Sequence, residues 1–114
     1  MYVEGTGEQT RNFIFVEDLA TGAVKAINES CRNKIITVAG KDAIKIIDLA
    51  ELIKKIFSKD NIKIICNKSK RRNDDYSGSM QDIELNKSIL DWEPRTTLKA
   101  GVEKYIDWLR HDEI

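Results

Sequence analysis

The most informative stretch of the sequence is Arg11-Asn12-Phe13-Ile14-Phe15-Val16-Glu17-Asp18, a short alternating run that ends in two acidic residues. Residues 11–16 place aromatic and aliphatic side chains on opposite faces, and this period of two predicts a short strand. Glu17 or Asp18 then predicts the start of a helix that continues to about Ser30. One stripe of this helix is apolar and consists of Leu19, Ala20, Ala23, Val24 and Ile27.

Two more strands are predicted further along the chain, over residues 34–38 and 61–66. Residues 1–10 are polar and contain the turn-forming run Gly5-Thr6-Gly7, so they predict a loop or hairpin turn. Residues 67–81 form a long polar stretch without periodicity, and loops of that length in compact domains are usually functional or disordered.

Three more helices are predicted, each with a polar residue at its start. The candidate caps are Asp48 with Glu51 as a capping box, Asp82, and Thr96 or Thr97. The first of these helices has an apolar stripe formed by Leu49, Leu52, Ile53, Ile56 and Phe57. The last is expected to turn inward Leu98, Val102, Tyr105, Ile106 and Leu109. We therefore predict an α/β fold, one small domain over residues 1–114 in which short strands alternate with about four helices.

The composition fits a globular protein, with 41% hydrophobic and 33% charged residues. Nineteen basic side chains balance 19 acidic ones, so no overall charge favours nucleic acid or an anionic membrane. No apolar run is long enough to span a bilayer, and the N-terminus has no apolar signal segment, which predicts a cytoplasmic protein.

Common catalytic and metal-binding patterns are missing from the chain. Cys31, Cys66 and His111 have no metal-ligand spacing, so neither a metal site nor a Cys-His nucleophile is predicted, and the thiols are expected to be free. No tyrosine is followed four positions later by lysine, and no glycine-rich loop follows a first strand. Gly5-Thr6-Gly7 precedes a strand, so we interpret it as a turn and not as a dinucleotide loop.

Five stretches, in this order and spacing, resemble the C-terminal portion of one family. They cover residues 7–18, 46–52, 72–75, 82–94 and 97–101. The family is that of the NAD-dependent nucleotide-sugar epimerases and dehydratases, the extended short-chain dehydrogenase/reductases, of which UDP-glucose 4-epimerase is representative. The resemblance covers nearly the whole chain, and it implies a substrate domain without its dinucleotide-binding domain.

The resemblance also implies a site for a nucleoside diphosphate. Arg11 and Arg72 would contact the two phosphates, because a guanidinium donates two hydrogen bonds in a planar fork. Asp75 would accept hydrogen bonds from the ribose, and Phe13 would pack against the base or sugar. We prefer Arg72 to the adjacent Arg71 because it keeps the Arg-x-x-Asp spacing.

Each of these residues also has a plainer interpretation. Arg11 could be a strand-end residue at the surface or part of an ion pair, Asp75 could form a turn, and Phe13 could be a core aromatic. Five other residues of the resemblance have structural roles as helix caps, packing anchor, helix stop and close helix contact, namely Asp18, Asp82, Trp92, Pro94 and Gly101. Two positions depart from the family pattern: Asn12 replaces an aspartate, and Asp91 replaces a glycine that a left-handed backbone would favour.

The expected function is therefore to position a nucleoside-diphosphate sugar in an NAD-dependent epimerase or dehydratase. NAD is expected in the full-length parent and not in this chain, which by itself is not expected to be catalytic. A homodimer through exposed apolar surface is also expected. The alternative is a stand-alone nucleotide-binding or interaction module that lost the enzyme. A glycine-rich βαβ segment upstream of Met1 in the reading frame would favour the enzyme.

Overall fold

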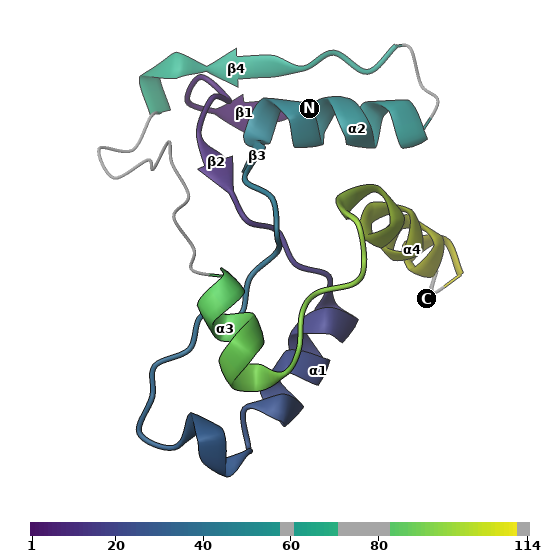
Figure 1. Cartoon of the computed structure of the whole chain (residues 1–114). Coiled ribbons are helices and arrows are strands. Elements are labelled where there is room, and N and C mark those ends of the chain that lie inside the picture. Colours follow the sequence, from purple (N-terminus) through teal and green to yellow (C-terminus); the bar gives the residue numbers. More distant parts are fainter. Residues whose placement is uncertain (58–60, 71–82, 112–114) are drawn as a thin grey trace. The chain divides into compact units, whose positions relative to one another are not determined.

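The computed structural model describes residues 1–57, 61–70 and 83–111. Contacts divide the chain into two compact units, each built from two stretches distant in sequence (Figure 1). Unit 1 consists of Met1–Arg11 and Ala43–Ser79, and unit 2 consists of Asn12–Asp42 and Met80–Ile114. That the two units act as the one domain expected for residues 1–114 stays a prediction.

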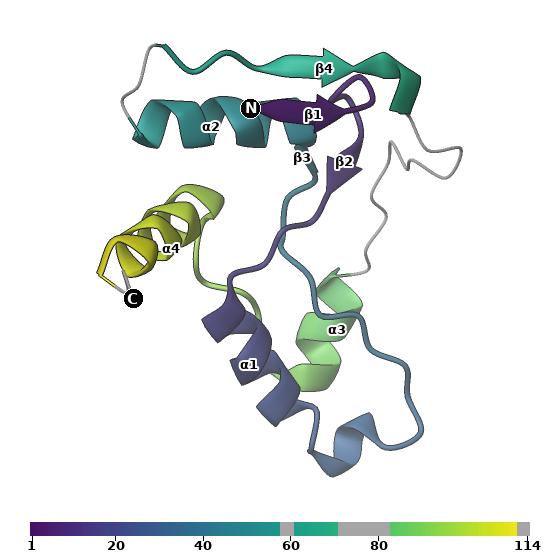
Figure 2. The ribbon, with the colours of Figure 1, turned by 180° about the vertical axis from the view of Figure 1, so that it is seen from behind.

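Unit 1 contains two small pairs of strands and one long helix. β1 (Tyr2–Glu4) pairs in parallel with β4 (Ile65–Asn67), and β2 (Thr10–Arg11) pairs antiparallel with β3 (Ile44–Lys45). β3 leads directly into α2 (Ile46–Ile56), and a single 3₁₀ turn, η2 (Lys68–Lys70), follows β4. Figure 2 shows α2 alongside the β1–β4 pair, where Val3 and Ala50 are buried.

The sequence prediction for unit 1 was wrong at two of its strands. Residues 1–10 were expected to form a loop or hairpin turn, but they include β1 and the first residue of β2. A three-residue strand in which only Val3 is buried carries too little alternation to be recognised without its partner. The predicted strand over 61–66 is shorter and later, because parallel pairing with β1 fixes β4 at Ile65–Asn67. The turn at Gly5 and Gly7 is confirmed, with φ of 79° at both.

The start of α2 shows why the predicted capping box is wrong. The helix begins at Ile46, two residues before Asp48, and no side chain caps it. Its first amides instead donate to backbone carbonyls of the turn between β1 and β2, Ile46 to Gln9 at 3.0 Å and Ile47 to Gly7 at 2.9 Å. These bonds satisfy helix-start donors that a capping side chain would otherwise bind.

Unit 2 contains three α-helices and a 3₁₀ turn. These are α1 (Val16–Lys25), η1 (Glu29–Cys31), α3 (Ile83–Leu90) and α4 (Leu98–His111). Leu90 is fully buried, and Cys31, Pro94 and Ile106 are buried with it in this unit. With α2 of unit 1, the described residues contain four α-helices and a few short strands, which confirms the predicted α/β class.

Two strands predicted in the region of unit 2 are wrong. The strand over residues 11–16 ends at Arg11, and α1 begins at Val16. Asn12 and Phe13 lie against Gly40 without strand pairing. The contact consists of the Asn12 side chain, which donates to the Gly40 carbonyl at 2.9 Å, and of the Phe13 main chain. Residues 34–38 form no strand with any described residue, although their sequence alternates like one.

The faces of α1 and α4 also differ from the prediction. The predicted apolar stripe of α1 is exposed, with Val24 67% and Ile27 82% accessible, and the buried residues are Asp18 and Gly22. α1 ends at Lys25 and not near Ser30. On α4, Tyr105 and Leu109 are exposed, not inward. Within the described residues no helix is long and apolar enough to cross a membrane.

Several local predictions in unit 2 are confirmed. Thr97 caps α4, because its side-chain oxygen accepts the Ala100 amide at 3.2 Å. Asp91 has φ of 48°, the left-handed conformation expected where it replaces glycine. Trp92 is a packing anchor, with its ring nitrogen donating to the Thr21 hydroxyl at 2.9 Å. A Cβ on Gly101 would lie 3.1 Å from the Phe15 ring, so Gly101 makes a close contact.

Candidate functional site

The proposed phosphate ligand Arg11 lies at the end of β2 in unit 1. Its backbone pairs with Ile44 of β3, and its side chain is exposed. One guanidinium nitrogen donates to the carbonyl of Thr10 at 2.8 Å, which bends the side chain back along its own strand. An exposed, permanently charged guanidinium on a paired strand fits a phosphate contact, and it equally fits a surface ion pair.

The turn before β2 fixes where this strand, and with it Arg11, lies in unit 1. The Gly5 amide donates to the Asn67 carbonyl at 2.9 Å, and the Gln9 side chain donates to the Glu4 carbonyl at 2.8 Å. A Cβ on Gly7 would lie 2.9 Å from the Cβ of Ile47, so glycine is needed there for close approach of the turn to α2. Lys45 and Glu8 form an ion pair of 2.7 Å beside the turn, and the hydrogen bond from this lysine to Glu8 raises the pKa of Lys45.

Phe13 belongs to unit 2 and is partly exposed, at 36%. Its main chain, not its ring, makes the tight contact: a Cβ on Gly40 would come within 1.8 Å of the Phe13 carbonyl oxygen. Asn12 strengthens this contact through its amide, and an ionised aspartate could not donate that bond. Sequence reasoning identified Asn12 only as a departure, and the signal it missed is the glycine at position 40.

The other two proposed ligands, Arg72 and Asp75, lie outside the described residues, as does the predicted cap Asp82. The four proposed ligands are Arg11, Phe13, Arg72 and Asp75, and only the first two are among the described residues. Their joint role stays a prediction.

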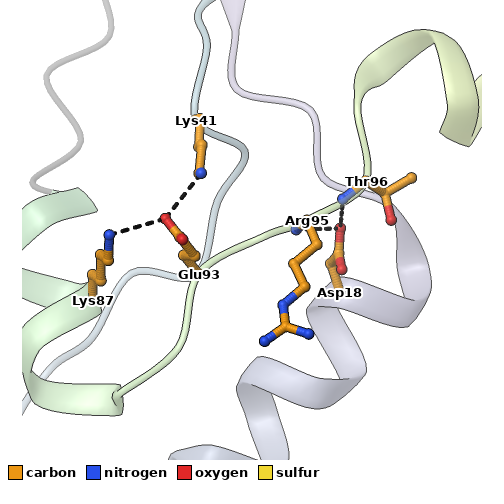
Figure 3. A network of polar contacts seen from close by, with 6 residues as sticks. All are labelled: Asp18, Lys41, Lys87, Glu93, Arg95 and Thr96. Carbon is orange, nitrogen blue, oxygen red and sulfur yellow. Dashed lines mark hydrogen bonds and ion pairs between the residues drawn. The ribbon is translucent and has the colours of Figure 1, made fainter.

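Asp18, expected to cap α1, instead supports the segment before α4 (Figure 3). It lies in the first turn of α1, and its carboxylate accepts the backbone amides of Thr96 at 2.8 Å and Arg95 at 3.2 Å. Burial by itself raises the pKa of Asp18, but the hydrogen bonds from Thr96 and Arg95 and the charge of Lys104 outweigh it, so the pKa lies below its ordinary value. Asp18 is thus structural, as predicted, but in a different place.

A second carboxylate holds the same segment from the other side (Figure 3). Glu93 contacts the ammonium groups of Lys41 at 2.9 Å and Lys87 at 3.2 Å. Hydrogen bonds from Lys41 and then Lys87 lower the pKa of Glu93. Segment 93–96 is therefore tied to the loop after Gly40, to α3 and to α1.

The described residues contain no group of three or more His, Cys, Asp or Glu side chains that could hold a metal ion. Neither α1 nor α2 begins with the kind of turn that binds NAD. The pyrophosphate of NAD is usually bound by free amides at a helix start that follows a glycine-rich turn. At α2 the first amides of Ile46 and Ile47 are already bonded to carbonyls, and α1 begins directly after Phe15 without a glycine.

Comparison with known proteins identifies the class of protein. No family model matches the chain. Over 108 residues it is 25% identical to UDP-glucuronate 4-epimerase of Thermodesulfobacterium geofontis, covering 95% of the chain and 32% of the relative. Over 111 residues it is 30% identical to UDP-glucuronic acid decarboxylase 1 of Danio rerio, covering 96% of the chain and 25% of the relative.

A solved structure agrees with these relatives. The crystal structure of UDP-glucuronic acid 4-epimerase from Bacillus cereus, in complex with UDP-glucuronic acid and NAD, superimposes with a TM-score of 0.82 at 25% identity. The match covers 96% of this chain and 35% of that one. The predicted resemblance is confirmed: the chain matches the C-terminal portion of an NAD-dependent nucleotide-sugar epimerase/dehydratase, an extended short-chain dehydrogenase/reductase. It spans only 32% of the relative from T. geofontis and 25% of the relative from D. rerio.

Proposed function

We propose that this chain is the substrate-binding portion of an NAD-dependent nucleotide-sugar epimerase or dehydratase. The observation that carries the proposal is the match of 95% of the chain to a UDP-glucuronate 4-epimerase, with Arg11 exposed at the end of a paired strand. The ligand is a nucleoside-diphosphate sugar, and the protein is cytoplasmic. The isolated chain is not catalytic.

In this proposal Arg11 and Arg72 neutralise the two phosphates, Asp75 accepts from the ribose hydroxyls, and Phe13 lies against the base or sugar. Their work is positioning: a substrate held in one orientation reacts as if at very high local concentration. NAD, bound by the rest of the parent protein, supplies hydride transfer there. Residues of this chain hold the nucleotide end of the substrate and leave the sugar free to meet the cofactor.

The experiment that tests this function is thermal melting of the purified chain with UDP, dTDP, GDP or CDP. A ligand that binds the folded state raises its stability by mass action, about 2.7 kcal/mol when the ligand is at 100 times its Kd. We expect at least one nucleotide to raise the melting midpoint. No shift at millimolar concentration of any of the four would contradict a preformed site.

Arg11→Ala assigns that shift to the proposed site. It should remove most of the nucleotide-dependent shift, because a charge-assisted bidentate contact is lost. Arg32→Ala is the matched control, since Arg32 is also exposed and forms an ion pair with Glu29 of η1 at 3.4 Å. An equal shift in Arg11→Ala and Arg32→Ala would reject Arg11 as a ligand.

A further inference from the structure

Among the described residues, Thr10 carries the only buried side-chain nitrogen or oxygen that has no hydrogen-bond partner, its hydroxyl oxygen. A buried hydroxyl in this position has given up its bonds to water and received none from the protein. Such groups are few in native proteins, and each one needs its own explanation. Thr10 directly precedes Arg11, the proposed phosphate ligand, on β2.

The main chain of Thr10 is well bonded. It pairs with Lys45 of β3, and its carbonyl oxygen accepts the Arg11 guanidinium at 2.8 Å. The unbonded hydroxyl is therefore not the result of a strand without a partner. Thr10 as a residue is half-buried, so its hydroxyl oxygen is covered on a residue that is still partly exposed.

Thr21 shows how the same side chain is satisfied elsewhere in the chain. Its hydroxyl donates to the Asp18 carbonyl at 2.9 Å and accepts the ring nitrogen of Trp92 at 2.9 Å. Valine has a similar branched shape and is at least as frequent in strands. A position in β2 that required only shape and burial would gain nothing from a hydroxyl, which favours a partner from outside the chain for Thr10.

The side chain of Arg11 brings such a partner close to Thr10. Neighbouring side chains of a regular strand point to opposite faces, but Arg11 bends back until one of its nitrogens lies on the Thr10 carbonyl. This carbonyl and the Thr10 hydroxyl belong to one residue and are joined only through Cβ, Cα and the carbonyl carbon. An anion held by the guanidinium in this orientation therefore lies near the Thr10 hydroxyl.

A threonine hydroxyl can take a new partner without a change in the main chain. Its oxygen moves between staggered positions about χ1, and its proton turns toward the nearest acceptor. A phosphate oxygen is a charged acceptor, and hydrogen bonds to charged groups are shorter and stronger than those between neutral groups. A phosphate at Arg11 would thus supply the bond that the Thr10 hydroxyl lacks.

We propose that Thr10 is a further substrate-binding residue, whose hydroxyl donates to an oxygen of the phosphate that Arg11 binds. This inference rests on the proposed function and adds a ligand to the same site. The free energy lost by covering the hydroxyl is recovered when the nucleotide binds. Thr10 therefore contributes to affinity for the nucleotide and not to the stability of the nucleotide-free chain.

The test compares Thr10→Val with Thr10→Ser in the full chain. Calorimetric titration with UDP, dTDP, GDP and CDP measures affinity, and melting without nucleotide measures stability. Thr10→Val keeps the branched shape and removes the hydroxyl, so it should weaken binding by about tenfold or more. It should not lower the melting midpoint of the nucleotide-free chain. Thr10→Ser keeps the hydroxyl and should bind the nucleotide with wild-type affinity.

Thr21→Val is the matched control, because the hydroxyl of Thr21 already has two partners. It should lower the melting midpoint and leave nucleotide affinity unchanged. Wild-type affinity in Thr10→Val would overturn the proposal, and so would equal weakening in Thr10→Val and Thr10→Ser. A midpoint lowered as much in Thr10→Val as in Thr21→Val would also overturn it, since the Thr10 hydroxyl would then have a partner without nucleotide.

The proposed function and the role of Thr10 fail at different measurements. Absence of nucleotide binding by the wild-type chain would reject the preformed substrate site and Thr10 with it. Wild-type binding that Arg11→Ala weakens and Thr10→Val does not would leave the site standing and reject Thr10 alone.

Discussion

Asp18 shows how a single residue can keep its importance while its role changes. A carboxylate at the start of a helix is the ordinary pattern of a cap, and the sequence suggests no other partner. The structure gives it two amide donors from a segment 77 and 78 residues away. Such a pairing depends on where α1 packs, which no local pattern contains.

The lowered pKa of Asp18 predicts a pH dependence. Because the folded-state pKa lies below the ordinary value of 3.8, the ionised carboxylate contributes stability above that pH, and the contribution disappears as pH falls through the folded-state pKa. Asp18→Asn should cost about 1–3 kcal/mol at neutral pH and progressively less in acid. Urea unfolding at several pH values measures this.

Asp107→Asn is the control for that prediction. Asp107 is exposed on α4 and lies 4.0 Å from Arg110, and surface pairs of this kind contribute about 0–1 kcal/mol. A cost for Asp18→Asn that stays constant from neutral to acidic pH would show that the carboxylate acts by shape and not by charge.

At the scale of elements, the connection between the segment after β2 and the loop at Gly40 determines where the predicted strand ends. A Cβ on Gly40 would lie 1.8 Å from the Phe13 carbonyl oxygen, and the Asn12 side chain donates a hydrogen bond to the Gly40 carbonyl. Alternation in the sequence predicts an extended backbone. It does not predict whether that backbone pairs with a second strand or makes only one close contact. This is why residues 12–15 read as a strand and are not one.

Gly40→Ala tests the close contact. A methyl group 1.8 Å from a backbone oxygen forces the main chain apart, so we expect a loss of more than about 3 kcal/mol in the free energy of unfolding. Gly101→Ala is the comparison: its Cβ would meet the Phe15 ring at 3.1 Å, and a side chain can shift. Denaturant midpoints of the two variants should differ clearly. Equal, small losses would mean that the segments separate without cost.

At the scale of the whole molecule, exposed apolar surface is the main feature. Val24, Ile27 and Ile35 are 67%, 82% and 103% accessible, and large apolar patches mark interaction sites. The isolated chain should therefore self-associate as its concentration rises, which sedimentation equilibrium measures. Ile27→Ser should reduce the association, and Ile65→Ser, in unit 1, should not. A monomer at high concentration would contradict this expectation.

The sequence was most successful where a signal is local or repeated along the chain. The family, the α/β class, the turn at Gly5 and Gly7, the Thr97 cap and the left-handed Asp91 are all confirmed. Each depends on a motif order or on conformational preferences within a few residues. The proposed ligands stay predictions, because Arg72 and Asp75 lie outside the described residues.

The amino-acid sequence alone is enough to predict which family the chain matches and which residues prefer to start or end a helix. The three-dimensional structure was needed to show which strands have partners, which face of α1 is buried, and that Asp18 supports the segment before α4. The physical reason is that pairing and burial are properties of two segments at once. An alternating pattern such as that of residues 34–38 gives a preference for extended backbone. Whether a strand forms depends on a second segment that can pair with it.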